Sequence, residues 1–198
     1  MEGIYAFPAD LRALAEEQTR DGERILWAGR PAPARAFLTA TPIWLFAVPW
    51  TVVSCVFFGS SLAAALGLAR IEGMERGAAW GFLLFSLPFF GIGLGLLAAP
   101  FIVLQEARRT AFVITDRRVL SLTANRSRTV KGLAASALRG AEARRFANGR
   151  GTVKALGPVG RDSDGDRVTD EIVMSGIADP SGAEQAVWSL VESARRRP

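Results

Sequence analysis

The fold is decided by two uncharged segments, AFLTATPIWLFAVPWTVVSCVFFGSSLAAALGLA (residues 36–69) and GAAWGFLLFSLPFFGIGLGLLAAPFIVLQ (residues 77–105). A short charged link, RIEGMER (residues 70–76), separates them. Each segment exceeds the ~20 apolar residues that cross a hydrocarbon core of about 30 Å. The pattern therefore predicts a transmembrane helical hairpin over residues 36–105, with helices at about 42–69 and 77–104.

The composition limits the classes of function. Of the 198 residues, 49% are hydrophobic, which suits two helices in lipid together with a soluble domain. The chain has no histidine and one cysteine, Cys55, which lies in the first apolar segment. Zinc sites and Ser–His or Cys–His nucleophiles need these residue types. We therefore expect no enzyme, no metal or cofactor site and no small-molecule substrate. Residues 1–35 are hydrophilic and unlike a secretory signal, so we expect the first helix to be retained as an anchor.

Basic residues dominate the stretch after the second apolar segment. Between Glu106 and Lys154 there are twelve Lys or Arg residues and three acidic ones. Such a run attracts anionic lipid or nucleic acid, or it keeps a segment in the cytoplasm. We favour cytoplasmic retention of both termini and expect no nucleic-acid partner. The candidate contacts for a lipid or protein partner are Arg108, Arg109, Arg117, Arg118, Arg144 and Arg145.

Small residues recur at intervals of four in both apolar segments. They are Gly59, Ala63 and Gly67 in the first, and Gly91, Gly95 and Ala99 in the second. Such faces let two helix backbones approach closely in lipid. We expect the hairpin to pack on itself through them; the alternative is dimerisation through Gly91 and Gly95. Neither helix carries a charge, which argues against an ion or proton pathway.

Two further motifs resemble ligand loops but do not predict a ligand. The stretch RDSDGD (residues 161–166) is rich in aspartate, yet its glycine does not fall where an EF-hand needs it. We expect an acidic connecting loop there. The stretch GIGLG (residues 91–95) lies inside an apolar segment with no strand before it, so we exclude a nucleotide-binding loop.

The segments that flank the hairpin predict an α+β domain. A short helix is expected over residues 10–20, capped by Asp10, with Leu11, Leu14 and Ala15 on its buried side. A helix at residues 180–196 is expected to cover an open end of the sheet with its apolar stripe, with Ser181 and Glu184 at capping-box spacing. The strands, which predict an antiparallel sheet or small barrel, are expected at residues 23–28, 110–115, 119–123, 129–133, 142–147, 151–156 and 171–175.

A family resemblance rests on two stretches, GERILWAGRP (residues 22–31) and ARRTAFVITDRRVL (residues 107–120). With the order of elements, they resemble the bacterial pleckstrin-homology-like membrane proteins over residues 22–196. The resemblance implies a small antiparallel β-barrel closed at one end by the C-terminal helix, with TDRR (residues 115–118) as a hairpin turn. The implied domains are an N-terminal helical segment (1–21), the first strand (22–35), the inserted hairpin (36–105) and the rest of the barrel (106–198).

This family has no catalytic residues to transfer, so the resemblance implies a binding module. We expect an inner-membrane protein that presents a cytoplasmic domain to a protein or lipid partner, or that forms a homo-oligomer through the hairpin or the barrel. Two alternatives stay open. The first is an accessory subunit of a larger membrane complex, and the second is a reader of anionic lipid headgroups.

Overall fold

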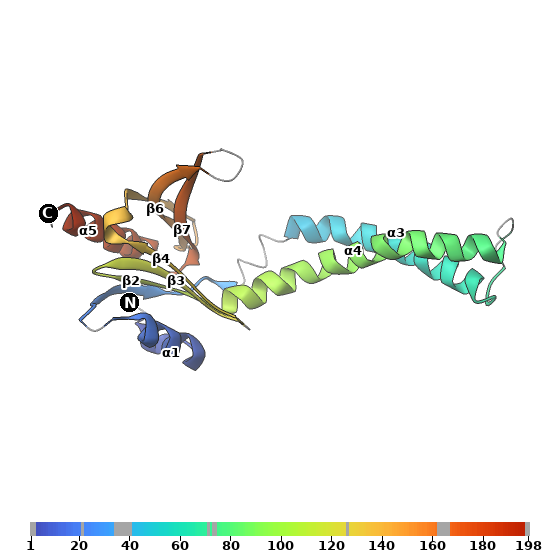
Figure 1. Ribbon diagram of the computed structural model, residues 1–198, viewed down its shortest axis with the longest axis horizontal. Coiled ribbons are helices and arrows are strands. Elements are labelled where there is room, and N and C mark those ends of the chain that lie inside the picture. The colour runs from blue at the N-terminus through green and yellow to red at the C-terminus, as the bar shows by residue number, and fades with distance from the viewer. Residues whose placement is uncertain are drawn as a thin grey trace. The chain divides into compact units, whose positions relative to one another are not determined.

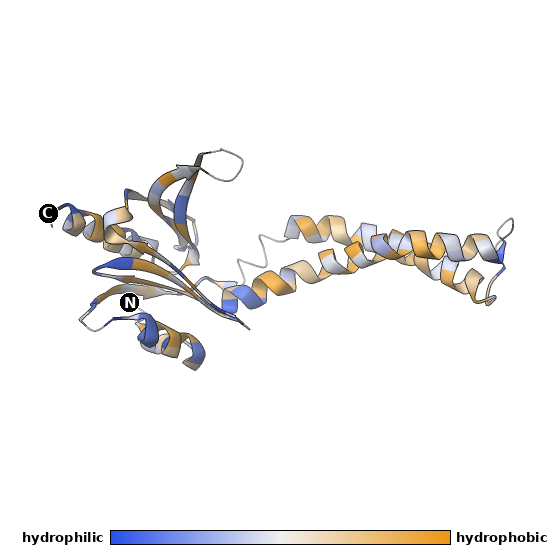
Figure 2. Ribbon diagram, in the orientation of Figure 1, coloured by the Kyte–Doolittle hydropathy of each residue, from blue (hydrophilic) through white to orange (hydrophobic). Residues whose placement is uncertain are grey.

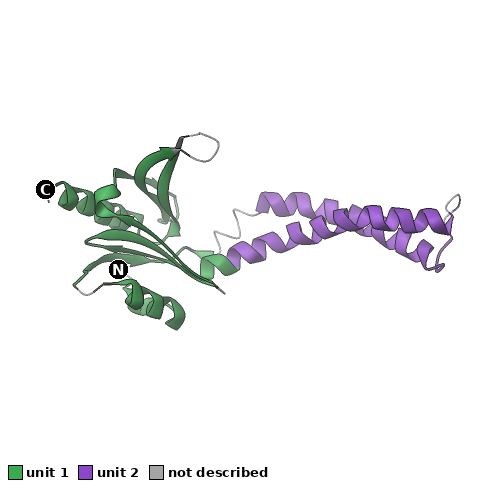
Figure 3. Cartoon of the chain, viewed as in Figure 1, with its two compact units in different colours: residues 1–36, 105–198 green, residues 37–104 purple. Residues whose placement is uncertain are grey.

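The computed structural model describes residues 3–20, 22–33, 41–70, 72, 75–125, 127–161 and 167–196. It divides into two compact units (Figure 3). Unit 1 joins Met1–Ala36 to Gln105–Pro198, and unit 2 is Phe37–Leu104. Residues 162–166 lie outside the described residues, so the expected acidic connecting loop without an EF-hand site stays a prediction.

Unit 2 is built from α3 (Thr41–Ala65) and α4 (Arg76–Arg108), which continues into unit 1. Both helices are long and apolar enough to cross a membrane, as the hydropathy colouring of Figure 2 shows. Helix α4 continues four residues past its predicted end at Leu104, because the following residues Gln-Glu-Ala-Arg all favour helix. Pro49 lies inside α3.

Unit 1 contains a four-stranded antiparallel sheet, the first sheet, in the order β1-β2-β3-β4 (Figure 1). Strand β1 pairs with β2 although α3 and α4 lie between them in the sequence. The strands are β1 (Ile25–Gly29), β2 (Thr110–Thr115), β3 (Arg118–Ala124) and β4 (Arg128–Ala134).

A second, three-stranded antiparallel sheet has the order β5-β6-β7. Its strands are β5 (Gly140–Arg145), β6 (Gly151–Arg161) and β7 (Arg167–Ile177), and the short helix η2 (Ala135–Ala137) precedes it. Strands β6 and β7 are much longer than predicted, because β6 continues past Pro158 through a bulge between Leu156 and Val159. Within the described residues the strands form two separate sheets and no closed barrel.

Strand β2 of the first sheet is buried on both faces, which explains why its sequence is a continuous apolar run. Phe112 and Ile114 belong to a core shared with the second sheet and with α5 (Pro180–Arg196). Ala111 and Val113 belong to a separate core on the other face, under α1 (Ala9–Gln18) and the short helix η1 (Ile4–Ala6). Alternate side chains of one strand thus enter two different cores.

Helices α1 and α5 bury the stripes that their sequences predict, but neither cap is the predicted one. Pro8 occupies the N-cap of α1, so Asp10 falls in the first turn and makes no capping bond. At the start of α5 the Asp179 Oδ1 atom accepts a hydrogen bond of 2.8 Å from the Gly182 N–H. Asp179 is therefore the cap in place of Ser181, and the Glu184 carboxylate binds elsewhere.

Candidate functional site

Arg118 holds unit 1 together and is not available as a partner contact. Its Nε atom lies 3.1 Å from Glu23 Oε1, and its Nη2 atom donates to the Gln18 carbonyl at 2.6 Å. The Glu23 side chain is 1% exposed, and its Oε2 atom also accepts from the Arg20 N–H at 3.1 Å. We call Arg118, Glu23 and Gln18 the α1 clamp, because they fix the end of α1 to β3.

Arg144 and Arg145 lie at the end of β5, and both are exposed. The Arg145 Nη2 atom forms a 2.6 Å ion pair with Glu184 of α5. The Arg144 guanidinium carbon lies 5.9 Å from the centre of the Phe146 ring, a cation–π distance. An incoming anion would therefore compete with Glu184 for Arg145, whereas Arg144 keeps its guanidinium donors free of any ion pair within the described residues.

Arg108 and Arg109 lie where α4 ends and β2 begins, and both side chains are exposed. The Arg109 Nη1 atom lies 3.4 Å from Asn125 Oδ1. Arg30, which the sequence analysis did not single out, donates from Nη2 to the Arg108 carbonyl at 2.7 Å. This cation satisfies a carbonyl at the C-terminal end of the helix, where positive charge suits the helix dipole.

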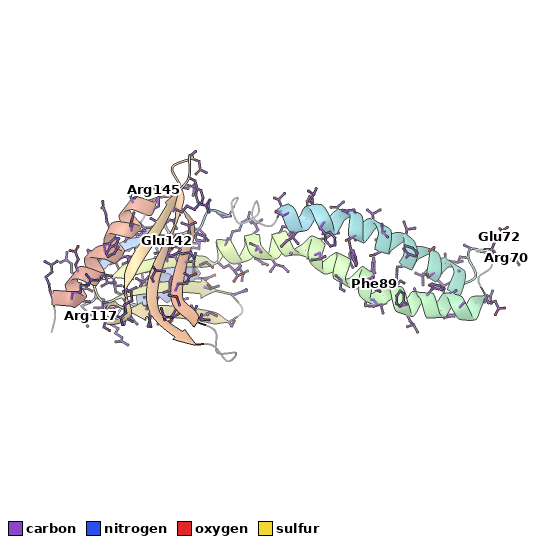
Figure 4. The ribbon with its side chains drawn as sticks, turned by 90° about the horizontal axis from the view of Figure 1, so that it is seen from above. Arg70, Glu72, Phe89, Arg117, Glu142 and Arg145 are labelled. Carbon is purple, nitrogen blue, oxygen red and sulfur yellow. The ribbon has the colours of Figure 1, made fainter. Side chains whose placement is uncertain are left out.

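The candidate arginines do not form one patch. Figure 4 shows Arg117 and Arg145 near opposite ends of α5. Arg108 and Arg109 lie at a third place, at the end of α4, and Arg118 is internal. Exposed guanidinium groups bind phosphate or carboxylate oxygens, and these groups lie at three separate places on unit 1.

Helices α3 and α4 pack through residues other than the small ones predicted. The contact residues alternate by three and four, as in left-handed helix pairs, and we call them the seam. On α3 they include Ala47, Thr51, Ser54, Ser61 and Ala65, and on α4 Ala79, Leu83, Ser86 and Gly93. A Cβ atom on Gly93 would lie 2.8 Å from the Thr51 Oγ1 atom, so the two backbones approach closely there.

Three of the predicted small residues, Gly59, Gly91 and Gly95, lie outside the seam. Cβ atoms on Gly59, Gly91 and Gly95 would meet no atom within 4 Å. Gly67 follows α3 with a φ of 73°, beside the Arg76 side chain. Ala63 and Ala99 are half-buried. The open glycines therefore belong to the outer surface of the hairpin.

A groove of about 470 Å³, which we call the aromatic groove, lies beside the seam within unit 2. Its aromatic lining is Phe46, Trp50 and Phe57 of α3 with Phe82, Phe85 and Phe89 of α4 (Phe89 is labelled in Figure 4). The Trp50 Nε1 atom donates to the Phe89 carbonyl at 3.3 Å, and their ring centres lie 6.2 Å apart. The sequence analysis missed this groove, although aromatic residues recur at helical spacing in both segments.

Four hydroxyl side chains of the hairpin lie at the seam. Thr51, Ser54, Ser61 and Ser86 are all buried, and the three serines also line the aromatic groove. The Ser86 hydroxyl donates to the Leu83 carbonyl of its own helix at 3.0 Å. Polar side chains between two helices are usual in lipid, where they face each other and not the hydrocarbon.

No group of three or more His, Cys, Asp or Glu residues comes together in the part of the chain that the structure describes. Comparison with family models, with curated proteins and with solved structures finds no match for this chain.

Proposed function

We propose that this chain is a non-enzymatic inner-membrane protein whose two helices anchor a cytoplasmic pleckstrin-homology-like binding module. One observation carries the proposal. Strands β1 and β2 are hydrogen-bonded neighbours in one sheet, and α3 and α4 lie between them in the sequence. Because one sheet lies on one side of a membrane, the chain crosses it an even number of times between these strands. Two membrane-length helices meet that condition.

The strand arrangement supports the pleckstrin-homology-like part of the proposal. The resemblance implies seven antiparallel strands with a C-terminal helix at one end. Unit 1 has four antiparallel strands in one sheet and three in the other, and α5 contributes Val187 and Leu190 to the core between them. A fold of this kind does not by itself name a ligand.

The charge distribution supports a cytoplasmic location. Lys and Arg residues close to membrane helices are retained in the cytoplasm. Arg108 and Arg109 come four and five residues after Leu104, the last residue of unit 2. The link between the helices offers two, Arg70 and Arg76, whereas the other side offers Arg24, Arg30 and Arg35 before the hairpin together with Arg108 and Arg109 after it.

The partner that we favour is the membrane surface or a protein bound at it. A rise of about 1.5 Å per helical residue sets Arg108 about 6 Å beyond Leu104. That distance is shorter than the Debye length of about 8 Å at physiological salt, so anionic headgroups attract this residue. The alternative of an accessory subunit predicts a protein that co-purifies at a fixed ratio after mild detergent extraction.

Cysteine labelling tests the proposed topology. In a Cys55→Ala background, Glu72→Cys reports on the link and Asn148→Cys on the turn after β5; both positions are exposed. We expect a membrane-impermeant maleimide to label Glu72→Cys in intact cells, and Asn148→Cys only after lysis. Labelling of Asn148→Cys in intact cells would refute the cytoplasmic location. A chain that alkaline carbonate washes from the membrane would refute the anchor.

A further inference from the structure

We propose that one edge of the first sheet docks on anionic headgroups of the membrane that the hairpin crosses. This inference rests on the proposed function, since it takes the membrane surface as the partner and names the part of unit 1 that meets it. Four described arginines carry it, and we call them the arginine edge: Arg30, Arg108, Arg109 and Arg128.

The register of the strands brings the arginine edge together. The Ala124 N–H donates to the Arg109 carbonyl at 2.9 Å, and Ala124 is also the register partner of Arg128. Arg109, before β2, and Arg128, at the start of β4, therefore flank the end of β3. Arg30 follows the end of β1, and its Nη2 atom donates to the Arg108 carbonyl at 2.7 Å. With about 4.8 Å between neighbouring strands, the row across the sheet is about 14 Å long.

Both connections between the first sheet and the hairpin start at the arginine edge. Strand β1 ends there at Gly29 and leads to α3, and α4 returns there and ends at Arg108. Only Arg109 separates α4 from β2. The opposite edge of the sheet, where β1 begins and β2 ends, is a whole strand farther along the chain from either helix. If the hairpin spans the membrane, chain connectivity therefore holds the arginine edge closest to the headgroups.

The charge of the arginine edge suits an anionic surface. Arg128 pairs with Glu17 at 3.1 Å, but both side chains are exposed, so the pair is weak and a phosphate can compete for it. Among the described residues, the other three arginines form no ion pair. Glu106, in the last turn of α4, is the exposed acid beside them. Guanidinium groups in this setting bind phosphate oxygens through charge-assisted hydrogen bonds.

The length of the arginine edge predicts which lipids it selects. Because the positions are spread over about 14 Å, we expect the attraction to follow the charge of the surface and not the shape of one headgroup. Phosphatidylglycerol and phosphatidylserine carry the same net charge and should support docking equally. Phosphatidylcholine, which carries no net charge, should not support it.

Fluorescence quenching tests the arginine edge in the full-length chain reconstituted in vesicles. In a Cys55→Ala background, Ser127→Cys carries a fluorophore next to Arg128, and a quencher is attached to the lipid headgroups. We expect strong quenching in phosphatidylcholine vesicles that contain phosphatidylglycerol, and little in phosphatidylcholine alone. A basic residue near an anionic surface contributes a factor of about five, the equivalent of about 1 kcal/mol. Arg108→Ala and Arg109→Ala together should therefore lower the ratio of docked to free unit 1 about 25-fold.

The opposite edge of the same sheet supplies the matched control. Arg24 and Arg117 are exposed there, and replacing both with Ala should leave the quenching unchanged. A second measurement needs no variant: salt shortens the Debye length from about 8 Å at physiological strength to about 3 Å at 1 M, which should release unit 1 of the wild type.

Three outcomes would overturn the inference: equal loss of quenching in the two double variants, quenching that neither salt nor lipid charge changes, or a preference between phosphatidylglycerol and phosphatidylserine. If the chain resists carbonate extraction and its quenching ignores lipid charge, the arginine edge fails alone. If carbonate removes the chain, the membrane anchor fails first.

Discussion

Replacing Arg118 with alanine should release α1 from the first sheet while the rest of unit 1 stays folded. The Glu23 side chain is 1% exposed and, among the described residues, would keep only the Arg20 N–H as a partner. Breaking a fully buried ion pair costs about 3–5 kcal/mol because a buried charge is left uncompensated. The Arg118 side chain is 19% exposed, so water compensates part of this loss. We therefore expect Arg118→Ala to lower the free energy of opening α1 by about 2–3 kcal/mol.

Hydrogen exchange of the full-length chain in detergent measures this effect residue by residue. A loss of about 2–3 kcal/mol raises the opening equilibrium, and with it the exchange of the amides of α1, about 30- to 150-fold. The change should be confined to α1 and the segment that leads into β1. Arg118→Lys keeps the charge but loses the two-point contact, so it should fall between wild type and Arg118→Ala.

The chain offers a matched control in Arg128→Ala. Arg128 pairs with Glu17 of α1 at 3.1 Å, the same distance as the pair in the α1 clamp, but the two side chains are 65% and 59% exposed. An exposed pair contributes about 0–1 kcal/mol, so exchange in α1 should rise by less than about tenfold. Equal exchange in α1 after Arg118→Ala and Arg128→Ala would refute the argument that burial decides the value of these pairs.

Two further predictions concern the hairpin and the membrane surface. Gly93→Leu should lower the melting temperature of the hairpin in detergent, because the new Cβ would lie 2.8 Å from Thr51 Oγ1. In the control, Gly91→Leu, the new side chain meets open space, so the melting temperature should stay unchanged. Equal melting temperatures of the two variants would contradict the assignment of Gly93 to the seam. Replacing Arg108 and Arg109 together with Ala should weaken the binding of anionic headgroups and reduce its dependence on salt. The measurement is the lipid selectivity of the reconstituted chain. Unchanged selectivity would exclude these residues as headgroup contacts.

The existence of α3 and α4 could be predicted from the sequence, but their packing could not. Uncharged length is enough to predict a helix that is long and apolar enough to cross a membrane. In lipid, both the buried and the outer faces of such a helix are apolar, so hydrophobic periodicity carries little information about the contact. The informative signal was the stripe of small and hydroxyl residues that includes Ala47, Thr51, Ser54 and Ser61. The glycines at intervals of four were more conspicuous and lie outside the seam.

The candidate arginines show a similar limit. Sequence gives the charge of Arg118 but not the buried carboxylate of Glu23, which lies 95 residues away in the chain. The same holds for Arg145, whose partner Glu184 belongs to α5. Charge density along the chain indicates where cations are frequent. Tertiary contacts decide which of these cations can bind a partner. They exclude Arg118 as a candidate contact and leave Arg144 as one.

In the proposed topology, the position of the hairpin couples the folding of unit 1 to the crossing of the membrane. Strand β1 contributes Trp27 to the core under α5 and Ala28 to the core under α1, so both cores need it. Strand β2, with which β1 pairs, is synthesised only after both helices. Because closing a long loop costs entropy, we expect β1 and β2 to pair late in folding. A hairpin that fails to return the chain to the side where β1 lies would leave both cores open. Gly93→Leu therefore gives a second readout: if the coupling holds, weakening the seam should also raise hydrogen exchange in β1, although no residue of β1 has been changed.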